Sequence, residues 1–279
     1  MQFLIQHHTH YRYSCPVRLG LQELRFYPRD DGMQRTLEHR ITVNPAPSGR
    51  NEHLDLEGNR VTQLWFEGET EDLDIHVEMR VETLRDNAYD FILNFGAMEL
   101  PVEYDQDTGL ANVYLERSDP DPSVTEFARA VDQAAQNETL CFLNALTGRL
   151  YADFSHVHRQ SGDPQRPVST LINRSGACRD LALLFVDCCR ARGIAARFAS
   201  GYHRGDLEKD RRHLHAWPEV YLPGAGWRGF DPTQGHAIAD THVTIAASAN
   251  PRNTLPVSGN FIGLGASSTL EYAVNIRVE

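Results

Sequence analysis

Long hydrophobic runs are missing from this 279-residue sequence, and no stretch approaches the roughly 20 apolar residues that a transmembrane helix requires. The first residues, MQFLIQHHTHYRYS, alternate like a β-strand and lack the basic start and apolar centre of a signal peptide. Basic residues are also in short supply, with 27 Lys and Arg against 38 Asp and Glu and a formal net charge of −11. This balance argues against general binding to nucleic acid or to an anionic membrane. The sequence therefore predicts a cytoplasmic protein with no nucleic-acid partner and no membrane partner.

Cysteine is scarce and its pattern is uninformative for cross-linking. The five cysteines are an odd number with irregular spacing: Cys15, Cys141, Cys178, Cys188 and Cys189. No CxxC or CxxH spacing indicates a structural zinc site. We expect reduced thiols without disulfides, and no cofactor or metal.

Histidine is more abundant, and six of the 13 histidines lie in the first third of the chain. His8 and His10 would share one face of a strand, which makes a metal site conceivable. However, no carboxylate or cysteine lies beside them at ligand spacing in the sequence. We therefore favour a solvated strand face over a metal site.

Residues 1–117 predict a β-rich N-terminal domain. Short alternating or β-branched runs lie at 3–5, 24–26, 39–43, 61–66 and 73–81. Turn signals separate them, for example PRDDG at 28–32 and NPAP at 44–47. Strands of this length and number are typical of an antiparallel sandwich or an open barrel. The proline- and acid-rich segment 116–123 is the clearest linker to the second domain.

Residues 118–279 combine helical and strand patterns, which makes the chain an α+β protein. Helices are predicted at 124–135 and 140–150, with a loop at 151–167. A helix followed by a strand is predicted within 173–202, with Ser175 and Gly176 at the helix entrance and Gly193 at its end. Residues 270–278 alternate cleanly and predict one more strand.

Cys178 falls in the first turn of the helix predicted within 173–202. A thiol there faces unpaired backbone N–H groups and the positive end of the helix dipole, and both favour the nucleophilic thiolate. Its own backbone N–H could bind an oxyanion. The alternative is that Cys178 is only a small buried apolar residue.

A β-hairpin is predicted downstream, with strands at 213–222 and 227–231 around the turn PGAG at 223–226. Pairing outward from the turn brings His215 opposite a residue within about two positions of Asp231. The two could form an ordinary polar cross-strand pair. Following Cys178, they also complete the order Cys, His, Asp of a papain-like catalytic triad. His213 shares a face with His215 and is the rival base, but it lies farther from the turn.

The sequence around these residues resembles the bacterial transglutaminase-like family, within the papain-like transglutaminase superfamily. The matching motifs are GACRD at 176–180, RGIAAR at 192–197, HAW at 215–217 and GWRGFDPT at 226–233. The resemblance extends to HYRY at 10–13 and LRFYPR at 24–29 in the first domain. It implies a papain-like core of helices packed on an antiparallel sheet. It also implies Cys178 as nucleophile, His215 rather than His213 as base and Asp231 as the orienting acid. The calcium requirement of animal transglutaminases is not implied, because no acidic loop here has calcium-ligand spacing.

Together these features predict cysteine-dependent acyl transfer at an amide bond of a peptide or protein substrate. Cys178 would form a thioester, which water or an amine would resolve, with hydrolysis favoured over amine cross-linking. One alternative is a non-catalytic module that holds a peptide in the same cleft. Another is a metal hydrolase with His213, His215, Asp231 and Cys178 as ligands.

Overall fold

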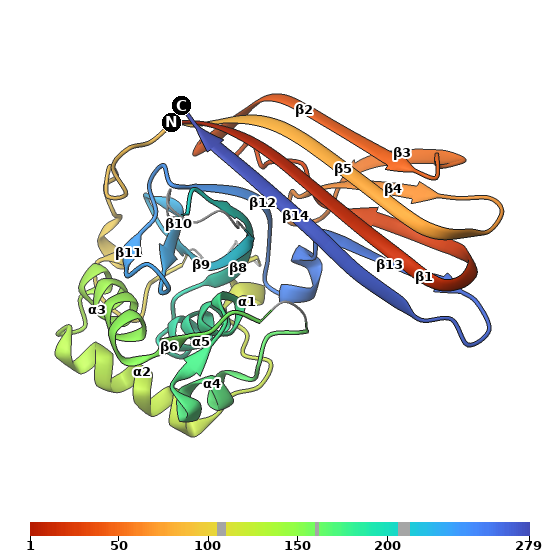
Figure 1. Cartoon of the computed structure of the whole chain (residues 1–279). Helices are drawn as coiled ribbons and strands as arrows, with labels where there is room; N and C mark the ends of the chain where they lie inside the picture. The colour runs from red at the N-terminus through yellow and green to blue at the C-terminus, as the bar shows by residue number, and fades with distance from the viewer. Residues whose placement is uncertain (105–109, 160–161, 206–212) are drawn as a thin grey trace.

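The computed structural model describes residues 1–104, 110–159, 162–205 and 213–279 of the chain. It contains a long, curled antiparallel sheet beside a core in which helices cover a second sheet (Figure 1). The predicted α+β class is therefore confirmed, and the curled first sheet has the barrel-like form of the two that were expected.

The first sheet is built around one strand, β1 (Gln2–Leu24), which is long enough to serve two sets of neighbours. Residues 2–12 of β1 pair with β5 and its first half also pairs with β14, whereas residues 18–24 pair with β13 and residues 22–24 with β4. A register shift between Arg12 and Val17 separates the two halves and lets the sheet curl. The remaining strands are β2 (Gln34–Asn44), β3 (Gly49–Leu54), β4 (Arg60–Trp65), β5 (Thr70–Thr83), β13 (Val257–Ile262) and β14 (Ser268–Val278).

The C-terminal strands belong to this first sheet. The strand predicted at 270–278 is present as β14, but it pairs along β1 from Phe3 to Tyr13 rather than with the core. Backbone bonds between Gln2 and Glu279 bring the two ends of the chain together (Figure 1). The run predicted at 3–5 lies at the start of β1, and the run predicted at 24–26 begins with the last residue of the same strand and continues beyond it.

The core contains a five-stranded antiparallel sheet in the order β11-β10-β9-β8-β12. Its strands are β8 (Ala196–His203), β9 (Leu214–Leu222), β10 (Gly226–Asp231), β11 (His236–Ala237) and β12 (His242–Ser248). Helices α1 (Leu110–Leu115), α2 (Pro122–Ala134), α3 (Thr139–Asp153), α4 (Pro167–Asn173) and α5 (Cys178–Ala191) accompany it, with 3-10 turns η1 (Phe95–Ala97) and η2 (Pro251–Thr254). Buried Val131, Leu146 and Phe185 from α2, α3 and α5 pack together in one apolar cluster.

The segment predicted as a loop at 151–167 is more structured than expected. Helix α3 continues to Asp153, and a two-residue strand β6 (Ser155–His156) pairs in parallel with β7 (Ser175–Gly176). Within the described part of the chain, no helix is long and apolar enough to cross a membrane.

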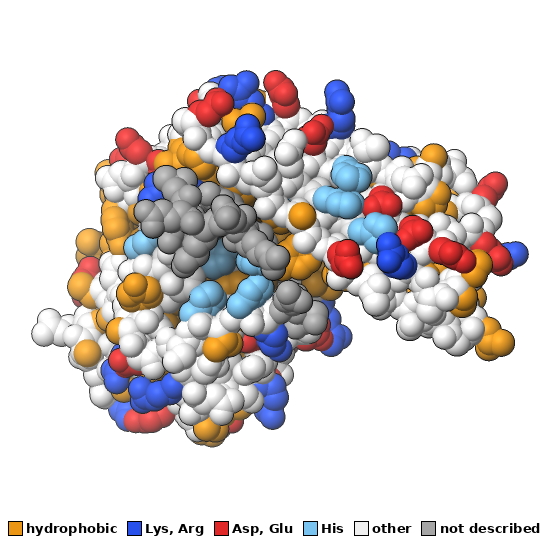
Figure 2. All heavy atoms as spheres, in the orientation of Figure 1, with side chains coloured by type: hydrophobic (Ala, Val, Ile, Leu, Met, Phe, Trp, Pro, Cys, Tyr) orange, Lys and Arg blue, Asp and Glu red, His pale blue; other side chains and the backbone are white. Residues whose placement is uncertain are grey.

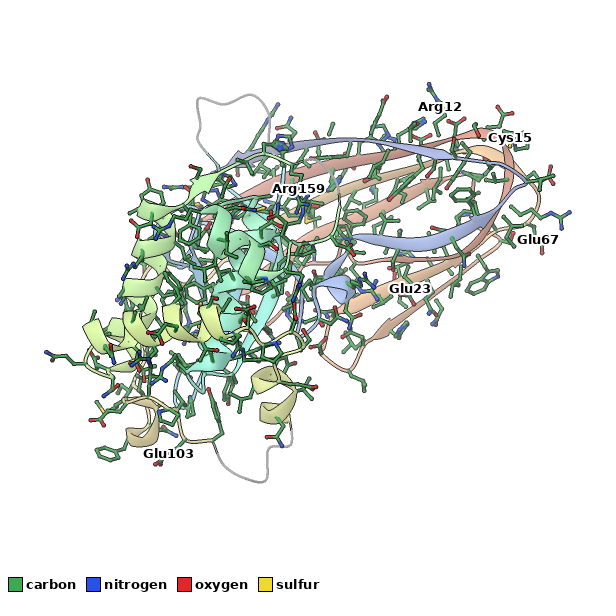
Figure 3. All side chains as sticks on the ribbon, turned by 90° about the horizontal axis from the view of Figure 1, so that it is seen from below. Arg12, Cys15, Glu23, Glu67, Glu103 and Arg159 are labelled. Atoms are coloured by element: carbon green, nitrogen blue, oxygen red, sulfur yellow. The ribbon has the colours of Figure 1, made fainter. Side chains whose placement is uncertain are left out.

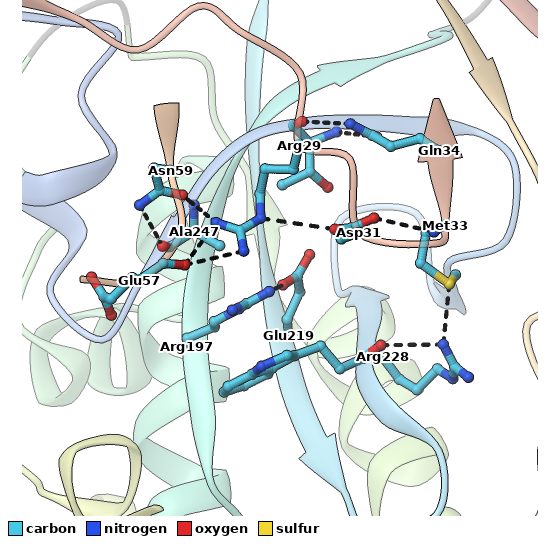
Figure 4. A network of polar contacts seen from close by, with 12 residues as sticks. Arg29, Asp31, Met33, Gln34, Glu57, Asn59, Arg197, Glu219, Arg228 and Ala247 are labelled. Carbon is cyan, nitrogen blue, oxygen red and sulfur yellow. Dashed lines mark hydrogen bonds and ion pairs between the residues drawn. The ribbon is translucent and has the colours of Figure 1, made fainter. Parts of the chain in front are cut away.

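Buried polar side chains join the first sheet region to the core (Figure 4). The Asn59 side chain both accepts from the Ala247 N–H at 2.9 Å and donates to the Ala247 carbonyl at 3.0 Å. Gln34 makes the same two-way bond with the backbone of Thr244. Both side chains thus extend strand β12 of the core sheet by mimicking a neighbouring backbone. Their burial makes the junction specific, because either amide would lose two bonds if the parts separated.

Candidate active site

Helix α5 begins at Cys178, and the carboxylate of Asp180 organises the chain around that point. Asp180 is fully buried, and its Oδ2 accepts the Ala177 N–H at 2.8 Å. Its Oδ1 accepts the Gln165 N–H at 2.8 Å and a guanidinium N–H of Arg159 at 2.6 Å. The helix entrance therefore rests on Asp180, where the sequence had suggested Ser175 and Gly176. The backbone N–H of Cys178, in the first helical position, has no acceptor within the helix.

The opposite end of α5 agrees with the sequence. Gly193 has φ of +75°, a left-handed conformation that suits glycine, and the helix ends at Ala191. The helix is thus fixed at both ends, which holds Cys178 in place relative to the sheet.

Cys178 lies between two imidazole rings. Burial raises the pKa of its thiol, but hydrogen bonds with His156 and His215, together with the positive charge of His215, outweigh burial and lower the pKa to about 6. This pKa favours a thiolate near neutral pH, as required of a sulfur nucleophile.

The hairpin places His215 and Asp231 in direct contact. Strands β9 and β10 pair Trp227 with Tyr221 and Gly229 with Glu219, a register that sets Asp231 two positions from the residue opposite His215. The Nε2 atom of His215 lies 2.7 Å from Oδ2 of Asp231. Because Nε2 serves the carboxylate, Nδ1 is the ring nitrogen left for the thiol. The structure thus brings together the three residues selected from the sequence.

Asp231 is fully buried and all its acceptor positions on Oδ1 and Oδ2 are engaged. Oδ1 accepts the backbone N–H and the hydroxyl of Thr233 at 2.8 and 2.7 Å. Oδ2 accepts from His215 and also from Nε2 of His242 at 2.9 Å. Burial alone would raise the pKa of Asp231, but the charge of His215 and these bonds hold it well below its usual range. The carboxylate in turn raises the pKa of His215 above its ordinary value, against the effect of burial.

His242 is the residue of this cluster that the sequence analysis missed. It starts β12, its exposed fraction is 4%, and its ring stands edge-on to Trp217 at 4.8 Å. Burial lowers the pKa of His242 to about 4, so its ring is neutral and donates one N–H to Asp231. Its position 11 residues beyond Asp231 carries no local spacing signal, since the contact depends on β12 crossing to the far edge of the sheet.

His156 was also missed, because the segment around it was interpreted as a loop. The parallel pairing of β6 with β7 places His156 beside Gly176, two residues before Cys178. Interaction with the His156 ring is the first of the causes that lower the pKa of the Cys178 thiol against burial. Pairing over only two residues is too short to leave a periodic pattern in the sequence.

His213, the rival base, lies away from Asp231. Its Nδ1 is 3.0 Å from the hydroxyl of Tyr272, and its Nε2 is 3.2 Å from Nε2 of His158. Among the described residues, the donor clusters compact enough for one metal ion are His215–Asp231–His242 and His8–His10–Asp74. Neither contains His213 or Cys178, so the ligand set considered for a metal hydrolase is not assembled.

The remaining cysteines are distinct from Cys178. All five are free thiols. Burial raises the pKa of Cys188 and of Cys189, which are inert core residues. Cys15 lies at the far end of the first sheet from Arg159, which stands near the start of α5 (Figure 3).

A cleft of about 820 Å³ opens above Cys178, between the core and the inner face of the first sheet. Its walls include His7, Thr9 and Tyr11 of β1 and Tyr272 of β14. Figure 2 shows histidine side chains gathered in the hollow between the two parts of the molecule. The C-terminal strand and the first strand therefore shape the space in which a substrate would meet the thiol.

Comparison with known proteins adds family and fold. A model described as the bacterial transglutaminase-like N-terminal region matches residues 3–82, and one described as the transglutaminase-like superfamily matches residues 125–232. Uncharacterised proteins of Mycobacterium tuberculosis and Mycobacterium bovis are each 26% identical over 291 residues, covering 99% of this chain and 92% of the relative.

Two further comparisons concern named proteins. A solved structure from Cytophaga hutchinsonii, named as a candidate cysteine protease, superposes with a TM-score of 0.74 at 21% identity and covers 99% of this chain and 90% of that one. At that identity the likeness shows the fold alone. A protein-glutamine gamma-glutamyltransferase of Pseudomonas aeruginosa is 39% identical over 67 residues, which is 22% of this chain and 10% of that protein.

Proposed function

Because the chain belongs to the transglutaminase-like superfamily, we propose that it is a cysteine-dependent acyl-transfer enzyme acting on an amide bond of a peptide or protein. The observation that carries this proposal is the arrangement of Cys178 and His215 in the wall of the cleft with Asp231 behind them. His156 and His215 lower the pKa of the thiol, and Nε2 of His215 lies 2.7 Å from Oδ2 of Asp231. In this proposal Cys178 is the nucleophile, His215 the base and Asp231 the acid that orients it, in the order that nucleophilic catalysis needs.

In the first half of the reaction the Cys178 thiolate attacks the amide carbonyl carbon. The carbonyl π electrons move to oxygen, and the resulting oxyanion lies beside the free N–H of Cys178. His156, on the other side of the thiol, is the side chain available as second donor. The imidazolium of His215 then gives its Nδ1 proton to the leaving amine, and a thioester remains.

In the second half, neutral His215 removes a proton from the incoming nucleophile, which attacks the thioester and returns Cys178 as thiolate. Water as nucleophile gives hydrolysis, and a primary amine gives a new amide. We propose that water is the usual acceptor. The same three residues can serve either acceptor, so the acceptor must be measured.

The test is turnover of glutamine-containing peptides, with ammonia release and peptide cleavage followed with and without a fluorescent primary amine. Hydrolysis predicts product formation without the amine and little incorporation with it. Cys178→Ala should lower kcat by about 10⁴-fold or more. His156→Leu should lower kcat by about 10²–10³-fold as a lost oxyanion donor, and His156→Gln should recover much of it.

The control is Cys141→Ala, which removes an exposed thiol on α3 and should leave turnover unchanged. Full activity in Cys178→Ala would refute the assignment of Cys178 as the nucleophile. If the wild-type protein binds these peptides but turns none of them over in any of these assays, the non-catalytic peptide module is favoured instead.

A further inference from the structure

The outer face of the first sheet carries a second cluster of histidines and carboxylates, remote from the thiol. Along β1, odd-numbered residues such as His7 and Thr9 face inward, whereas His8 and His10 face outward. Figure 2 shows histidine and acidic side chains gathered on the outer side of these strands. The pairing of β1 with β5 sets His10 opposite Asp74, a carboxylate that lies 64 residues away in the sequence.

This pairing overturns the sequence-based argument against a metal site here, which was that His8 and His10 have no carboxylate partner. Oδ1 of Asp74 lies 2.9 Å from Nε2 of His8 and 2.9 Å from Nδ1 of His10. The three donor atoms all lie within 4.8 Å of one another. With bond lengths near 2.0–2.2 Å, the ligands of a tetrahedral zinc ion are separated by about 3.3 Å. The two distances to Asp74 are close to this separation, so one ion could be reached by adjusting the side-chain torsions of the two histidines.

Neighbouring side chains hold the two rings in the orientation that binding requires. The second nitrogen of His10, Nε2, lies 2.9 Å from Oδ1 of Asp72, the arrangement that fixes the tautomer and strengthens a histidine ligand. The ring of His76 stacks on that of His8 with centroids 4.0 Å apart and planes 9° from parallel. The cluster thus has both the ligands and the supporting contacts of a metal site. A positive charge is also near, since Nε of Arg12 lies 3.7 Å from the same Asp72 oxygen.

We infer that His8, His10 and Asp74 bind one Zn²⁺ ion, with the fourth position open to water. Two imidazoles and one carboxylate are borderline and hard donors that suit Zn²⁺, and three protein ligands plus water form a common zinc arrangement. The ion would bridge β1 and β5. It would therefore stabilise the folded chain by mass action, as any ligand of the native state does.

Calorimetric titration of the full-length protein with Zn²⁺, after removal of bound metal, tests the inference. One equivalent should be lost in His10→Ala and in Asp74→Asn but kept in His53→Ala, which removes an exposed histidine of β3. Asp72→Asn should weaken binding by about 10–100-fold while leaving the ligands in place. Zinc should raise the melting temperature of the wild type and of His53→Ala but not of His10→Ala.

A zinc ion held at the cleft thiol would survive His10→Ala and disappear in Cys178→Ala, and that result would overturn the site. Equal stoichiometry and affinity in wild type and His10→Ala would do the same. An effect of Asp72→Asn no larger than that of His53→Ala would remove the supporting role of Asp72.

Discussion

The reactivity proposed for Cys178 would depend on its charged neighbours rather than on exposure. Against the effect of burial, His156 and the ring and charge of His215 lower the pKa of the thiol. The pKa of His215 is raised mainly by Asp231, with a smaller contribution from Cys178. Coupled groups titrate as a pair, so a measured profile reports the pair. The thiolate and the imidazolium should therefore coexist at pH values above the pKa of the thiol and below the pKa of His215.

We predict that alkylation of Cys178 by iodoacetamide rises as pH increases through about 6, because the thiolate forms above its pKa. His215→Ala removes the positive neighbour of Cys178, while burial still disfavours the thiolate. The rise in alkylation rate should therefore move to the pH range of an ordinary thiol or higher. Intact-mass spectrometry with peptide mapping measures both.

Cys141 is the internal control for this experiment. It is exposed, and a hydrogen bond with Glu138 raises its pKa, so at pH 7 it should label more slowly than Cys178. If Cys178 labels no faster than Cys141, the thiolate–imidazolium pair is not assembled in solution.

At this scale local patterns, a helix start and a hairpin, were enough to select Cys178, His215 and Asp231 as neighbours, and the family resemblance chose His215 over His213. Their catalytic roles stay a prediction. The sequence was insufficient for His242 and His156. Their contacts with Asp231 and Cys178 arise from the order of strands in the sheet and from a two-residue pairing, neither of which leaves a periodic signal.

At the scale of elements, the start of helix α5 depends on Asp180 more than on any capping residue before the helix. We predict that Asp180→Ala lowers the free energy of unfolding by about 3 kcal/mol. It leaves the buried N–H of Ala177 and the partly buried N–H of Gln165 without acceptors, at roughly 1–3 kcal/mol each. The alkylation rate of Cys178 should fall as well, since its position depends on this turn. Chemical denaturation measures the first effect.

The matched control is Asp119→Ala, which removes an acid from an exposed ion pair with Arg166 at 2.6 Å. Such a pair contributes only about 0–1 kcal/mol. Comparable losses in the two variants would mean that Asp180 acts as an ordinary surface charge. The sequence analysis predicted the helix but not the role of the Asp180 carboxylate as acceptor, because Asp180 follows the helix start instead of preceding it.

At the scale of the molecule, the chain leaves the first sheet, forms the core and then returns, so that its last strand pairs with its first. The division at 117 and 118 is visible in composition, yet Arg117 makes a two-bond ion pair with Asp187 of α5, at 2.7 and 2.8 Å. Strands β13 and β14, which follow the core in sequence, pair with β1. Alternation predicts that 270–278 is a strand, but it cannot identify a partner more than 250 residues away.

The whole molecule should also lose stability in mild acid because of three histidines near the junction of its parts. Burial is the main cause that lowers the pKa of His7 and of His242 to about 4 and of His203 to about 3. In the unfolded chain these rings titrate near 6.5. Between about 4 and 6.5 the unfolded state therefore binds more protons, and stability falls as pH falls. His215 stays protonated when folded throughout this window and adds little to the slope.

Replacing one of these rings removes one proton from the difference in protonation between the unfolded and folded states. Unfolding free energy should then depend less steeply on pH. His7 lies on the inner face of β1, with Nδ1 2.8 Å from the hydroxyl of Tyr202. We predict that His7→Gln reduces the slope of unfolding free energy against pH by up to about 1.4 kcal/mol per pH unit. His53→Gln on exposed β3 should keep the wild-type slope. Urea titrations between pH 4.5 and 6.5 measure these slopes. An unchanged slope in His7→Gln would show that His7 is already protonated in the folded state, and the loss of stability in acid would then have another origin.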